Sequence, residues 1–146
     1  MTDLDQVRAL AATETGLCVV STTRSDGSPH ATVVNAGVLP HPANGVEIVG
    51  FVVRGDARKL EHLRRAGRCA VTFRRAWSWA GVEGTVDIAG PDDEFPGLDR
   101  QAISRLLRDI FSAAGGTHDD WDEYDRVMRE ERRAAMLVYP ERLSGR

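Results

Sequence analysis

The spacing of apolar residues changes along the chain from helical to β-type. Within residues 3–15, Leu4, Val7 and Leu10 recur at helical spacing. An aspartate can cap the start of this run, and Gly16 can end it. We therefore expect a first helix over residues 3–15.

Six later runs are rich in β-branched and other apolar residues. They cover residues 17–24, 30–39, 46–54, 68–75, 79–89 and 134–139. The first two are separated by Ser25-Asp26-Gly27-Ser28-Pro29, and an Asp-Gly pair between β-rich runs is a strong hairpin signal. Pro40 to Gly45 predicts another loop, and Pro140 ends the last run.

Three further segments carry helical periodicity. They cover residues 56–66, closed by Gly67, then 98–113 and 121–133. Asp120, with Glu123 three residues later, predicts a capping box for the last of these helices. An acidic loop with proline and glycine, residues 90–97, precedes the second.

Six strands with hairpin connections and peripheral helices indicate an α+β fold. We predict a six-stranded antiparallel sheet closed into a small barrel, formed by one domain over residues 1–146. Strict alternation of strands and helices is absent, which argues against a dinucleotide-binding fold with a parallel sheet.

Composition narrows the class of protein. The chain is 42% hydrophobic and 28% charged with a net charge of −3, which is typical of a folded domain and not of a general nucleic-acid binder. No apolar run is long enough to span a membrane, and the acidic N-terminus does not resemble a signal peptide, so we expect a cytoplasmic protein. Cys18 and Cys69 lie in apolar runs and are expected to be buried thiols.

The start of the helix expected at residue 56 carries an electrostatic anomaly. If Asp56 is the N-cap, Arg58 and Lys59, the only lysine of the chain, lie in the first turn, where the helix dipole disfavours cations. A bound phosphate would reverse this effect by accepting the free amide hydrogens and pairing with both side chains, and Arg54 could join them. The alternative is a solvated basic helix face.

Other side chains suggest chemistry less specifically. Trp77 and Trp79 are two residues apart, so on a strand they would face the same way and could stack on a flat ring, or simply pack. The four histidines (His30, His41, His62 and His118) show no paired metal-ligand spacing, so we expect no metal site. Neither a nucleophile elbow nor a glycine-rich phosphate loop is present.

In their order, these features resemble the pyridoxamine 5′-phosphate oxidase-like split β-barrel family of flavin- and deazaflavin-binding proteins. The resemblance is carried by the Ser25–Pro29 hairpin, by Gly50-Phe51-Val52-Val53-Arg54-Gly55-Asp56-Ala57-Arg58-Lys59, and by the run after it to Arg68. The later segments Gly116–Tyr124, Glu131–Arg133 and Tyr139–Arg142 resemble the actinobacterial branch that uses coenzyme F420, a deazaflavin.

The resemblance implies a homodimer with two cofactor sites at its interface. It implies that Arg58 and Lys59 hold the cofactor phosphate. It places the ring and ribityl chain along one strand and at the end of another, at His30, Thr32, Val33, Val34, Asn35, Val52 and Val53. The last two positions often carry Tyr-Thr in the family, so Val-Val here removes a hydroxyl contact. The substrate-binding Trp and Arg pattern of true pyridoxamine phosphate oxidases is missing beyond Pro140.

We therefore expect an F420-dependent reductase that passes a hydride to a conjugated small-molecule acceptor, with no catalytic side chain identified. Two alternatives remain open. One is an FMN-dependent oxidoreductase of the same fold, and the other is a non-catalytic protein that binds F420.

Overall fold

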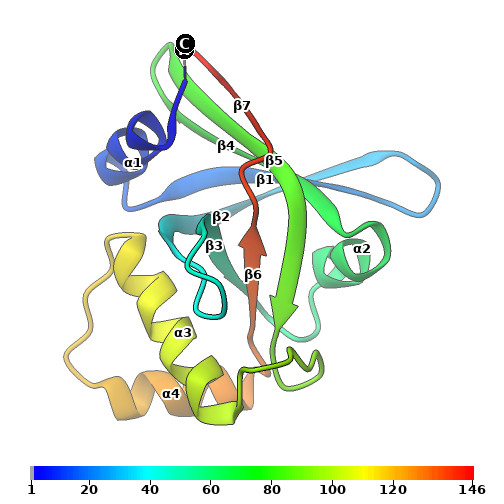
Figure 1. Ribbon diagram of the computed structural model, residues 1–146, viewed down its shortest axis with the longest axis vertical. Helices are drawn as coiled ribbons and strands as arrows, with labels where there is room; N and C mark the ends of the chain where they lie inside the picture. Colours follow the sequence, from blue (N-terminus) through cyan, green and yellow to red (C-terminus); the bar gives the residue numbers. More distant parts are fainter. Residues whose placement is uncertain (1) are drawn as a thin grey trace.

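Six of the seven strands close into a barrel. The computed structural model describes residues 2–146, so that Met1 of the expected domain lies outside the described residues. The elements are α1 (Leu4–Thr13), β1 (Leu17–Thr23), β2 (Pro29–Pro40), β3 (Glu47–Val53), α2 (Arg58–Ala66), β4 (Arg68–Arg75), β5 (Ser78–Ala89), α3 (Arg100–Ala113), α4 (Trp121–Glu130), β6 (Ala134–Val138) and β7 (Arg142–Gly145). Strands β4-β1-β2-β3-β6-β5 pair in that order, and β4 with β5 closes the ring (Figure 1). The predicted α+β class and six-stranded antiparallel barrel are confirmed.

Two long strands divide the barrel into halves. β2 and β5 have 12 residues each. β2 pairs with β1 through residues 29–35 and with β3 through residues 36–40. β5 pairs with β4 through residues 78–85 and with β6 through residues 86–89. Each long strand therefore belongs to both halves of the barrel, and α2 packs Leu60 and Leu63 against the apolar cluster of the barrel.

The molecule has two apolar clusters. The first fills the barrel and includes Val20, Phe51 and Phe73, with α1 packed against it. The second lies between the outside of β3 and β6 and helices α3 and α4. All five residues of β6 are buried, because one face of this strand lines the barrel and the other packs under α3. A Cβ at Gly50 would lie 3.0 Å from Ile110, so glycine permits the close approach of α3 to β3.

The structure confirms one predicted helix cap and corrects two predictions for α4. Asp3 caps α1 as expected, with a complete capping box to Gln6. Asp120 accepts a hydrogen bond from the Glu123 amide, but no return bond from the Glu123 side chain forms, so the predicted box is incomplete. α4 ends at Glu130 and not at residue 133, because Arg132 adopts a left-handed conformation with a φ of 50°.

Strand β7 was not predicted. It pairs with the first half of β5 through Ala80–Glu83. Its four residues are too few to show an alternating pattern, and they follow Pro140. Only the free edge of β5 makes this segment a strand.

Candidate functional site

Helix α2 begins without a side-chain cap. The predicted cap at Asp56 is wrong, because the N-cap residue is Ala57, which has extended backbone angles and a methyl side chain that cannot accept a hydrogen bond from the first-turn amides. The Asp56 carboxylate instead accepts a hydrogen bond from Arg54 Nε at 3.2 Å. Arg58 and Lys59 are therefore the first two residues of a helix whose N-terminus has no carboxylate or hydroxyl cap.

The turn before α2 is fixed by the segment that joins α4 to β6. The Gly55 amide donates to the Glu131 carbonyl at 3.1 Å, and a Cβ at Gly55 would lie 2.8 Å from the Arg132 Cβ. The Glu131 carboxylate lies 3.4 Å from Arg54 and 2.9 Å from Arg133. Residue-by-residue reasoning did not assign Glu131 and Arg133 to this site, although the Glu131–Arg133 run was part of the family resemblance.

Arg58 and Lys59 are the unpaired cations of this turn. Within residues 2–146, neither side chain forms an ion pair with a carboxylate, whereas Arg54 contacts two. Lys59 is half-buried, and burial lowers its pKa, with the Arg133 charge acting in the same direction. An anion at the helix start would offset both effects, because it would accept the free amides and pair with both side chains.

Strand β2 presents the predicted residues on two opposite faces. His30, Thr32 and Val34 are half-buried and share the face that looks toward α2, where the His30 ring lies 5.1 Å from that of His62. Val33 and Asn35 belong to the outer face, which is exposed. A single chain therefore brings only the first three of these residues toward the start of α2.

Val52 and Val53 end strand β3 just before the turn. Val53 is 2% exposed and belongs to the barrel interior, whereas Val52 packs against the cluster under α3. Neither side chain can donate or accept a hydrogen bond. They shape the wall beside the turn and add no polar contact.

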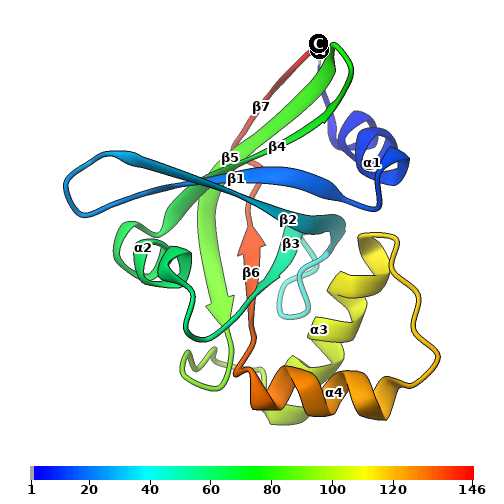
Figure 2. The ribbon, with the colours of Figure 1, turned by 180° about the vertical axis from the view of Figure 1, so that it is seen from behind.

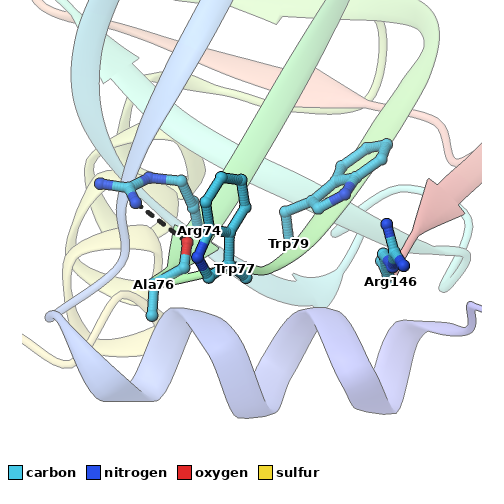
Figure 3. A pocket seen from close by; sticks show the side chains of 5 residues that line it. All are labelled: Arg74, Ala76, Trp77, Trp79 and Arg146. Atoms are coloured by element: carbon cyan, nitrogen blue, oxygen red, sulfur yellow. Dashed lines mark hydrogen bonds between the residues drawn. The ribbon is translucent and has the colours of Figure 1, made fainter.

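The two tryptophans lie elsewhere. Trp77 is in the turn between β4 and β5 and not on a strand, so the two rings do not share a strand face. Both rings line a hollow of about 520 Å³ with Arg74, Ala76 and Arg146 (Figure 3). This hairpin end lies beside the C-terminus and away from α2 (Figures 1 and 2). One chain alone does not bring Trp77 or Trp79 to the α2 turn.

The remaining candidate groups have local partners. His41 is buried, accepts a hydrogen bond from the Ala43 amide and therefore donates through Nε2 to Asp87 at 3.0 Å. Burial raises the pKa of Cys18 and of Cys69 to about 12, as expected for inert thiols. Across residues 2–146, no three His, Cys, Asp or Glu side chains gather as metal ligands.

Comparison with known proteins places the chain in a family. Residues 4–143 match the pyridoxamine 5′-phosphate oxidase family, and the chain belongs to it. Together, the barrel and this match define a flavin-type oxidoreductase fold. Over the described part of the chain, no helix has both the length and the apolar character needed to cross a membrane.

Solved structures share the fold at low sequence identity. An FMN-binding protein related to pyridoxamine 5′-phosphate oxidase from Nostoc punctiforme has a TM-score of 0.70 at 10% identity, covering 97% of this chain and 80% of that one. An F420 reductase has a TM-score of 0.59 at 17% identity, covering 88% of each chain. A heme storage protein from Vibrio cholerae has a TM-score of 0.57 at 10% identity, covering 99% and 94%.

Proposed function

We propose that the protein is a coenzyme F420-dependent reductase that passes a hydride from reduced deazaflavin to a conjugated small-molecule acceptor. The observation that carries the proposal is the uncapped start of α2 with its unpaired Arg58 and Lys59. A phosphate-bearing cofactor provides the anion that this turn lacks. The resemblance of Gly116–Tyr124 to the deazaflavin branch favours F420, and one structure with the same fold is an F420 reductase.

FMN is the second candidate, because another structure with the same fold is an FMN-binding protein. Against it stand Val52 and Val53, which offer no hydroxyl where the family often has one. A non-catalytic role is the third candidate, and the similar heme storage protein illustrates that this fold also serves binding without a named reaction.

The residues of the chain would act by binding and positioning. When bound, the deazaflavin supplies the hydride. The first amides of α2, with Arg58 and Lys59, would hold the phosphate. Lys59 would contribute a contact that solvent screens less, because its side chain is half-buried. The inward face of β2, with Thr32 and Val34, would form the wall along which the rest of the cofactor lies and would exclude water from it.

We further propose a homodimer through the outer face of the barrel. Val19 pairs with Val33 on β2 and with Thr72 on β4, and Thr72 pairs with Gly81 on β5, two residues from Trp79. The exposed apolar side chains Leu17 (44%), Val19 (40%), Val33 (65%) and Trp79 (37%) therefore share one surface, which we call the outer β-face.

In a homodimer with a twofold axis, the outer β-face of one copy would contact the same face of the other copy. If the twofold axis crosses the strands, the β4–β5 hairpin of one copy lies against the opposite end of the outer β-face of its partner. Trp77 and Trp79 would then reach the second copy's site, which a single chain does not allow. Val33 and Asn35 would lie in the same interface.

The test is a fluorescence titration of the apoprotein with F420 and with FMN. We expect a lower Kd for F420, and a lower Kd for FMN would overturn the cofactor choice. Reduced F420 is then offered with a panel of conjugated acceptors. Turnover of at least one acceptor supports a reductase, and tight binding without any turnover supports the storage role.

A further inference from the structure

A side-chain hydrogen bond joins α2 to the barrel wall one turn after Lys59. His62 Nδ1 lies 2.9 Å from Thr22 Oγ1 of β1. Both side chains are buried, with 8% of His62 and 3% of Thr22 exposed. The bond fixes the rotation of α2 about its axis, which the neighbouring apolar contacts of Leu60 and Leu63 leave less specific.

A second imidazole, that of His30, lies next to the His62 ring. The His30 ring lies 5.1 Å from that of His62 in an edge-to-face arrangement, and His30 Nδ1 is buried without a hydrogen-bond partner. The His30 ring therefore offers His62 an edge-to-face contact, and Thr22 supplies the hydrogen bond of the His62 ring.

The charges around the pair disfavour protonation. Burial lowers the pKa of His62, and His30, Arg65 and Arg24 act in the same direction, whereas Glu61 opposes them. Arg65 donates to the Thr23 carbonyl, and Arg24 donates to the Pro29 carbonyl at 2.5 Å, so both cations are held beside the histidines by the hairpin of β1 and β2.

We propose that His62 is a positioning residue for the anion site at the start of α2, and that it holds the helix only in its neutral form. A proton on His62 would place an imidazolium beside His30, Arg24 and Arg65. The ring would leave Thr22 for solvent, and α2 would shift with it. Arg58 and Lys59, one turn earlier on the helix, would then lose their alignment.

The direction of the pH effect follows from linkage. The pKa of His62 is lower in the folded protein than in the unfolded chain, so the unfolded chain binds more protons between the two values. The contribution to stability is complete above the ordinary histidine pKa of about 6.5 and is lost as the pH falls toward the folded value. Anion affinity should fall only at lower pH, below the pKa of His62 in the folded protein, because the imidazole of the folded protein is neutral above that value. This inference rests on the proposed function only in assigning the anion to a cofactor.

The experiment measures sulfate and F420 affinity between about pH 5 and 8, where sulfate keeps its charge, together with the melting temperature of the apoprotein. His62→Asn keeps a hydrogen-bonding group near the Nδ1 position and cannot titrate in this range. His62→Leu removes the bond. Arg105→Ala is the control, because Arg105 is exposed on α3, away from the start of α2.

We expect the affinity of the unmodified protein to fall by up to about tenfold for each pH unit below the pKa of His62 in the folded protein. His62→Asn should bind as the unmodified protein does at pH 7.5 and lose most of this pH dependence. His62→Leu should bind more weakly at every pH, and Arg105→Ala should follow the unmodified protein.

The proposal is overturned if His62→Asn keeps the full pH dependence or if His62→Leu binds like the unmodified protein. If sulfate binds with the expected pH dependence and neither F420 nor FMN binds, the proposed function is wrong and the role of His62 stands.

Discussion

At the scale of single residues, Arg58 and Lys59 are neighbours in different environments. Arg58 is exposed, whereas Lys59 is half-buried with a lowered pKa. A charge-assisted hydrogen bond contributes about 1.5–3 kcal/mol. Lys59→Ala and Arg58→Ala should therefore each raise the cofactor Kd by roughly ten- to a hundredfold. Fluorescence titration measures this effect, and we expect the larger one for Lys59, whose contact is less screened.

Arg105→Ala is the control for these two variants. Arg105 is exposed on α3 and forms no ion pair in the described chain. Without cofactor, the Arg58→Ala and Lys59→Ala variants should melt at or slightly above the melting temperature of the unmodified protein, because each substitution removes a cation from the positive end of a helix. If both variants bind cofactor as tightly as Arg105→Ala does, the anion site is not at this turn.

The two cysteines provide a prediction that does not depend on the cofactor. Cys18 donates through Sγ to the Val34 carbonyl at 3.6 Å, and burial raises the pKa of both thiols to about 12. Because the thiolate is the reactive form, a disulfide reagent at pH 8 should react with neither cysteine in the folded protein. Both should react at once in denaturant. Rapid labelling under native conditions would contradict this account.

At the scale of elements, α2 leaves its N-terminus uncapped, and a cap can be added. Ala57 already has N-cap backbone angles, with a φ of −73° and a ψ of 138°. Ala57→Ser and Ala57→Asp should each stabilise the apoprotein by about 1 kcal/mol, because a side-chain oxygen would accept a first-turn amide. Thermal melting measures this gain.

The Ala57→Ser and Ala57→Asp variants should differ in their affinity for the cofactor. The carboxylate that Ala57→Asp introduces would repel an anion at the same amides, so this variant should have a cofactor Kd well above that of Ala57→Ser. Equal affinities for the two variants would show that the cofactor phosphate does not use the start of α2.

Element boundaries also show how local signals succeed and fail. Gly67 closes α2 as predicted, in a left-handed conformation with a φ of 68°. The predicted cap at Asp56 is wrong by one residue, because Asp56 bonds Arg54 and the turn is set by Glu131, which is distant in sequence. A local pattern cannot include such a partner.

At the scale of the whole molecule, the outer β-face predicts self-association. Val33 is 65% exposed in the middle of this face. Val33→Glu should convert a dimer into a monomer, because it would place two carboxylates in a self-paired apolar interface. Light scattering at micromolar concentration measures the change. An unmodified protein that is already monomeric would remove the basis for the dimer and for a site shared between copies.

The sequence by itself determined the six strands of the barrel, most helix ends to within two residues, and the class of fold. Alternating apolar positions and turn residues act within a few residues of each other, so their signal survives without the rest of the chain. The same holds for the cationic first turn of α2. Its anomaly lies in the position of Arg58 and Lys59 just after the helix start expected at Asp56.

Only the tertiary structure decided which of the candidate residues lie together. The pairing of β2 with β1 puts His30 and Thr32 on one face and Val33 on the other, and the β4–β5 turn carries Trp77 away from α2. The bond from His62 to Thr22 joins residues that are 40 positions apart. Strand register and helix packing set these contacts, and both depend on side chains from distant segments, so no local pattern could reveal them.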